Sequence, residues 1–123
     1  MVIKVKLTQY DLLDDKNEVL LESKAIYDKT SLKYIEDSTH AKHEIYFEDD
    51  HIILNRNADI QTNIVLHDSK LGEGIVDSPY GRMTMQTKLI QAQKCDEYWM
   101  IEYQLLMNDE IVLHRQLRWN FTF

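Results

Sequence analysis

The stretch EIVLHRQLRWNFTF, residues 110–123, alternates apolar and polar side chains along its length. Side chains two residues apart share one face of a β-strand, so this period of two predicts a strand with one buried and one hydrated face. The buried face would carry Ile111, Leu113, Arg115, Leu117, Trp119 and Phe121. The N-terminal stretch VIKVKLT, residues 2–8, repeats the pattern with Ile3, Val5 and Leu7.

Seven segments between these two show the same alternation: residues 19–29, 31–37, 41–50, 51–58, 60–68, 82–91 and 98–109. In the first of them Val19, Leu21, Ala25 and Tyr27 would face the core. Alternation of this regularity is typical of antiparallel strands. No segment has the spacing of an amphipathic helix, so the sequence predicts an all-β fold of eight or nine strands with little helix.

A single domain over residues 1–123 follows from the length and from the absence of a linker or repeat. Its strands could form a sandwich or a closed barrel. Neither the first nor the last strand contains proline, and each would be aggregation-prone if left as an open edge. Pairing them favours a single antiparallel β-barrel that is closed or nearly closed.

The window GEGIVDSPYG, residues 72–81, holds all three glycines and the only proline of the chain. SPYG, residues 78–81, suits a β-turn with Pro79 at its second position. Alternatively, the window is a corner or bulge at which a long strand bends to close a barrel. Both interpretations are structural and are favoured over a functional loop, which is the alternative.

Four short motifs resemble one known family. They are YIED (34–37), ILNRNA (53–58), DSPYGRMTMQTKL (77–89) and IEYQLLMND (101–109). On these the chain is similar to the YwiB-like bacterial proteins, a family of unknown function. The resemblance implies a calycin-type, lipocalin-like β-barrel and no established activity. The chain departs from the family pattern at Asn57 and Ala58, where a glycine is usual, and at Ser78, which replaces a threonine.

The charge balance excludes some classes of partner. The chain has 21 acidic residues against 14 Lys and Arg, a net charge of −7, and the basic residues are scattered. We therefore expect no nucleic-acid partner and no binding to an anionic membrane. The single cysteine, Cys95, and an N-terminus unlike a signal peptide predict a cytoplasmic protein.

Polar residues on the predicted buried faces are the candidates for function. By alternation the charged ones are Glu36, Arg56 and Arg115, and the others are Tyr34, Tyr103, Thr62, Thr87 and His43. An interior charge is costly unless it is paired, so Glu36 should pair with Arg56, and a structural pair is favoured over a site. Arg115 would then lack an acid.

The five predicted ligand-binding residues are therefore Arg56, Arg115, Glu36, Tyr34 and Tyr103. An unpaired interior guanidinium is suited to bind a carboxylate or phosphate. A bulge could instead turn Arg115 outward, or its head could reach the barrel mouth.

No catalytic motif, cofactor-binding motif or metal-ligand spacing is present, so we expect no catalytic residues, cofactor or metal. The leading hypothesis is a barrel that holds a small amphipathic or anionic ligand. The alternative is a ligand-free interaction or structural module that acts through its outer face. Its apolar residues would be Ile26, Ile90, Met100 and Leu106, which could also form the surface of a homodimer.

Overall fold

The computed structural model describes residues 1–123, which form ten β-strands and no helix. The strands are β1 Val2–Asp11, β2 Lys16–Tyr27, β3 Ser31–Ile35, β4 Lys42–Phe47, β5 His51–Asn57, β6 Gln61–His67, β7 Gly72–Ser78, β8 Gly81–Lys94, β9 Tyr98–Met107 and β10 Glu110–Thr122. No helix is therefore long and apolar enough to cross a membrane.

Each strand pairs antiparallel with the strands before and after it in the chain, and β1 pairs with β10 to close the barrel. The closing ladder runs from Lys4 opposite Thr122 to Asp11 opposite Arg115. The predicted closed antiparallel barrel and its pairing of the first and last strands are confirmed.

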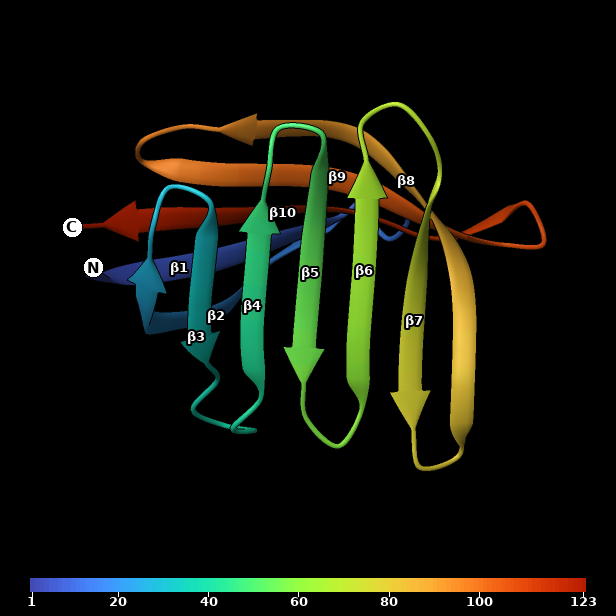
Figure 1. Cartoon of the computed structure of the whole chain (residues 1–123), viewed down its shortest axis with the longest axis horizontal. Coiled ribbons are helices and arrows are strands. Elements are labelled where there is room, and N and C mark those ends of the chain that lie inside the picture. Colours follow the sequence, from blue (N-terminus) through green and yellow to red (C-terminus); the bar gives the residue numbers. More distant parts are fainter.

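The barrel is flattened into two layers whose strands cross (Figure 1). Strands β3 to β7 form one layer, and β9, β10 and β1 form the other. The long strands β2 and β8 connect the two layers at opposite corners, where each bends.

The tenth strand is β7, which the sequence placed in a turn region because it contains two of the three glycines. It ends at the two-residue turn Pro79–Tyr80, with Ser78 opposite Gly81. Residue 72 must be a glycine, because a Cβ there would lie 2.1 Å from the carbonyl oxygen of Val65. The window is therefore both a hairpin turn and a position of close backbone approach.

Three β-bulges change which face some apolar residues occupy. The ladder registers shift past Leu20 in β2, Ile90 in β8 and Val112 in β10. A bulge reverses the alternation beyond it, so Val19 and Ile111 are half exposed instead of buried. The interior assignment of these two residues was wrong.

Aromatic side chains fill one end of the barrel. Trp99 is fully buried and packs against the rings of Tyr27, Phe47 and Phe121 at centroid distances of 5.8, 5.4 and 5.5 Å. Lys94 covers this group, with its Nζ donating to the carbonyl oxygen of Phe47 at 3.0 Å. This end is closed, so an interior site must lie toward the other end of the strands.

Candidate functional site

A pocket of about 330 Å³ lies at the opposite end of the barrel interior. Leucine, isoleucine and tryptophan side chains from both layers form most of its wall: Leu7, Leu20, Leu21, Ile45, Leu54, Ile64, Leu117 and Trp119. The polar lining includes Tyr34, Glu36, His43, Arg56, Thr62 and Arg115. The pocket thus combines an apolar wall with a few polar groups, which is the composition of small-molecule sites.

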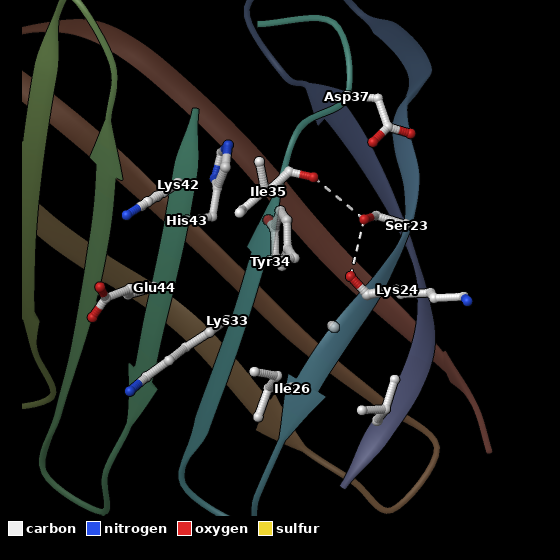
Figure 2. Close-up of a pocket in the computed structure, with 12 residues that line it drawn as sticks. Ser23, Lys24, Ile26, Lys33, Tyr34, Ile35, Asp37, Lys42, His43 and Glu44 are labelled. Carbon is white, nitrogen blue, oxygen red and sulfur yellow. Dashed lines mark hydrogen bonds between the residues drawn. The ribbon is translucent and has the colours of Figure 1, made fainter. Parts of the chain in front are cut away.

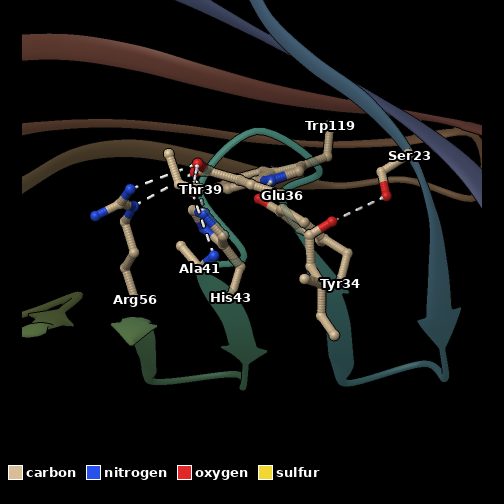
Figure 3. Close-up of polar contacts among 9 residues, drawn as sticks. Ser23, Tyr34, Glu36, Thr39, Ala41, His43, Arg56 and Trp119 are labelled. Carbon is tan, nitrogen blue, oxygen red and sulfur yellow. Dashed lines mark hydrogen bonds and ion pairs between the residues drawn. The ribbon is translucent and has the colours of Figure 1, made fainter. Parts of the chain in front are cut away.

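Glu36 organises one side of this pocket (Figure 3). It follows β3 directly, and its carboxylate accepts hydrogen bonds from Thr39 Oγ1 at 2.6 Å and His43 Nε2 at 2.5 Å. Arg56 adds two longer bonds, from Nε at 3.3 Å and from Nη2 at 3.4 Å. The predicted Glu36–Arg56 ion pair is confirmed, although Arg56 is only one of three partners.

These contacts set the charge on this side of the pocket. Burial alone would raise the pKa of Glu36, but hydrogen bonds from Thr39, Arg56 and His43 outweigh it and hold that pKa at about 2. Burial lowers the pKa of His43, and its bond to Glu36 only partly offsets this effect. At neutral pH Glu36 is therefore charged and His43 is neutral.

Arg115 on β10 lies on another side of the pocket and contacts only neutral groups. Its Nε donates to the hydroxyl of Tyr103 at 2.6 Å, and its Nη1 donates to Oε1 of Gln9 at 3.1 Å. Its guanidinium lies 5.2 Å from the centre of the Tyr103 ring. No carboxylate lies within 4.0 Å of the Arg115 guanidinium. Asp11 is paired with Arg115 in the β1–β10 ladder, but its carboxylate accepts hydrogen bonds from the backbone of the β1–β2 turn instead.

Tyr34 and Trp119 line the pocket where it meets the packed core. Trp119 Nε1 donates to the hydroxyl of Tyr34 at 3.0 Å, and both side chains are buried. The Tyr34 ring stacks on His43 at a centroid distance of 4.7 Å. Burial raises the pKa of Tyr34 and of Tyr103, so both hydroxyls are neutral hydrogen-bonding groups at neutral pH.

Four of the five predicted site residues line the pocket: Tyr34, Glu36, Arg56 and Arg115. The fifth, Tyr103, lies behind Arg115. Gln9 and Thr39 were missed. Gln9 lies on the same face of its strand as Ile3, Val5 and Leu7, so the alternation of the sequence could have identified it. Thr39 lies in the β3–β4 turn, where no strand alternation applies.

A second, more open cavity of about 460 Å³ lies on the outer surface between β2 and β3 (Figure 2). Lys24, Lys33 and Lys42 line it, and it shares Tyr34 and His43 with the interior pocket. It lacks both arginines, so we take the interior pocket as the candidate site. No group of three or more His, Cys, Asp or Glu side chains is placed to hold a metal ion.

These features define the molecule as an up-and-down β-barrel with one end packed by aromatic side chains and one end that carries a polar pocket. The model of a family described as a domain of unknown function (DUF1934) matches residues 3–118. The chain belongs to this family.

A similar solved structure is the crystal structure of the ywiB protein from Bacillus subtilis, with 13% sequence identity and a TM-score of 0.59. The match covers 99% of this chain and 91% of that one. It shows a shared fold and confirms the predicted YwiB-like resemblance. No curated protein matches the chain.

Proposed function

We propose that the interior pocket binds a small amphipathic molecule through a carboxylate or phosphate group. The observation that carries the proposal is Arg115, a half-buried guanidinium whose protein partners are the neutral oxygens of Tyr103 and Gln9. A guanidinium offers five N–H donors in a planar fork that matches these anions. Its Nη2 has no protein partner and is free for a ligand.

The local charge supports an anionic ligand. Arg56 and Arg115 contribute two positive charges and Glu36 one negative charge, so the pocket is positive although the chain carries −7. Charges that face a partly desolvated cavity act more strongly than charges in water. The negative charge of Glu36 is already compensated by hydrogen bonds from three residues, Thr39, His43 and Arg56. Arg115 makes no contact with Glu36, so its guanidinium is available to a ligand anion.

The apolar wall supports a ligand that also has a hydrocarbon part. Leu7, Leu21, Leu54, Ile64 and Leu117 present aliphatic side chains to the same cavity. Burying apolar ligand surface against them is favourable by roughly 25 cal/mol per Å² before the costs of association. The ligand class is therefore an anion with a short aliphatic or aromatic part.

Titration with octanoate, octyl phosphate and octanol tests the proposal. Trp119 lines the pocket, so its fluorescence should report binding. We expect either anion to bind at least tenfold more tightly than octanol, and Arg115→Ala to remove that preference, because a charged hydrogen bond contributes about 1.5–3 kcal/mol. Arg118→Ala is the matched control, since Arg118 is exposed on the same strand. Equal binding of octanol and octanoate would contradict the proposal.

The outer-face alternative gains no support from the four apolar residues expected to carry it. Met100 is buried, and Leu106 is partly buried. Ile26 on β2 and Ile90 on β8 are exposed, but these two strands are not neighbours in the barrel. A homodimer remains a prediction, which light scattering on the purified chain would test.

We also propose a cytoplasmic location, without nucleic-acid or membrane partners. Cys95 is a free and exposed thiol in the β8–β9 turn, which suits a reducing compartment. Fractionation of the host cell would test this location.

A further inference from the structure

One strand of the barrel has a largely unpaired edge. β2 spans twelve residues and pairs with β1 along nearly all of them, but it pairs with β3 only at Ile26–Lys33 and Tyr27–Leu32. Ten backbone hydrogen bonds lie outside the strand ladders, and none involves residues 16–25. Every second residue in this part of β2 therefore directs its N–H and C=O away from β1, on the side toward β3, without a backbone partner.

The open part of this edge runs from Lys16 to Glu22. Beyond it Ser23 approaches β3, with its Oγ 3.4 Å from the carbonyl oxygen of Ile35, and this contact blocks an added strand there (Figure 2). Val19 and Leu20, in the middle of the open edge, are 54% and 43% exposed. An edge that offers backbone groups and apolar side chains is a template for an added strand.

The same edge borders the interior pocket. Leu20 and Leu21 on β2 line that pocket. Glu18 on β2 is opposite Gln9 on β1, and Gln9 accepts the hydrogen bond from Arg115. A strand added to β2 would lie two strand spacings, about 10 Å, from β1. Arg115 lies on β10, but its guanidinium extends to β1, where Nη1 lies 3.1 Å from Oε1 of Gln9. A terminal residue that turns inward from the added strand would therefore approach the guanidinium.

The geometry points to the C-terminus of an extended peptide as the ligand of this pocket. The peptide pairs in β-fashion along residues 16–22 of β2, places its last side chain against the apolar wall, and gives its terminal carboxylate to Arg115. A pocket of about 330 Å³ lies at the lower end of the usual range of about 300–1,000 Å³, which suits one terminal residue. This inference rests on the proposed function, because it names the source of the anion.

Selection from a random heptapeptide library with free C-termini tests the inference. The matched library carries the same peptides with amidated C-termini. We expect the full chain to enrich only free-acid peptides with an apolar last residue. For an enriched peptide, amidation or the variant Arg115→Ala should weaken binding at least tenfold, and Arg118→Ala should not.

Backbone methylation separates strand addition from simple carboxylate binding. N-methyl groups at alternate positions of the enriched peptide should abolish binding, whereas those at the intervening positions should be tolerated, because an edge strand uses every second amide. Indifference to methylation at every position would overturn the strand-addition geometry.

The outcomes also separate this inference from the proposed function. If octanoate binds in an Arg115-dependent manner but no free-acid peptide is enriched, the peptide inference is wrong and the anion pocket stands. If neither octanoate, octyl phosphate nor any peptide binds, both are wrong.

Discussion

At the residue scale, Glu36 holds the polar end of the barrel together. Its carboxylate receives bonds from the β3–β4 turn through Thr39, from β4 through His43 and from β5 through Arg56. Removing a charge with several partners leaves those partners unsatisfied in a partly buried site. Glu36 is therefore a structural residue that positions Arg56 and His43 at the pocket.

Glu36→Gln should lower the free energy of unfolding at pH 7 by about 1–3 kcal/mol, because it leaves partly buried donors without a charged acceptor. The folded-state pKa of Glu36 is about 2, below its ordinary value of 4.5. Its stabilising contribution is therefore present above about pH 4.5 and is lost as the pH falls toward about 2.

Urea denaturation of wild type and Glu36→Gln between pH 7 and pH 3 measures both effects. The difference between them should shrink with acidification. Glu22→Gln is the control, because Glu22 is exposed on β2. A constant difference across this pH range would show that the Glu36 carboxylate does not carry the effect.

At the element scale, Gly72 at the start of β7 allows the corner between β6 and β8 to close. A Cβ on this residue would lie 2.1 Å from the Val65 carbonyl oxygen and 2.5 Å from the Thr87 hydroxyl oxygen. Thr87 is fully buried and donates to the same carbonyl at 2.5 Å. Backbone and a buried side chain therefore occupy the space that any larger residue would need.

Gly72→Ala should destabilise the fold by about 3 kcal/mol, at the upper end of the usual cost of overpacking. Gly74→Ala is the matched control in the same strand, where the nearest atom to the new Cβ is a Thr87 methyl at 3.3 Å. Thermal melts followed by circular dichroism compare the two. Equal melting temperatures for both variants would contradict the close approach at Gly72.

The same elements show what could be predicted from the sequence. Alternation identified nine strands. It also placed Glu36, Arg56 and Arg115 on the inner face, because each of these charged residues stands at a position where the alternation predicts an apolar one. It could not locate the bulges at Leu20 and Val112, since a bulge depends on the partner strand's register. β7 was missed because its two glycines break the alternation. The need for glycine at residue 72 comes from its contacts with Val65 on β6 and Thr87 on β8, which the local sequence pattern does not show.

At the scale of the whole molecule, the closed barrel still has unequal edges. β1 has ladders on both sides, whereas residues 16–22 of β2 have a ladder on one side only. Amides without a ladder partner are open to water. The fold is therefore closed in topology but exposes one strand edge beside its pocket.

Hydrogen–deuterium exchange should resolve this difference. Segments within β1 should exchange slowly, and about half of the amides in residues 16–22 should exchange quickly, because ladder bonds use alternate residues. Protection of residues 16–22 that rises with protein concentration would instead show that a second copy covers the edge. Uniform protection at every concentration would contradict an open edge.

The two ends of the barrel differ in chemistry, and this difference suggests how a ligand would enter. The aromatic group around Trp99 closes one end. The other end presents Glu36, Arg56 and Arg115 around an apolar cavity. A ligand would enter at the polar end and meet Arg115 with its anionic group.

Native mass spectrometry of the untagged protein, purified gently from its own host, tests the central claim most directly. We predict a defined adduct that is lost on denaturation, absent from Arg115→Ala and retained by Arg118→Ala. An adduct that persists unchanged in a folded Arg115→Ala variant would contradict Arg115 as the anion-binding group of the pocket.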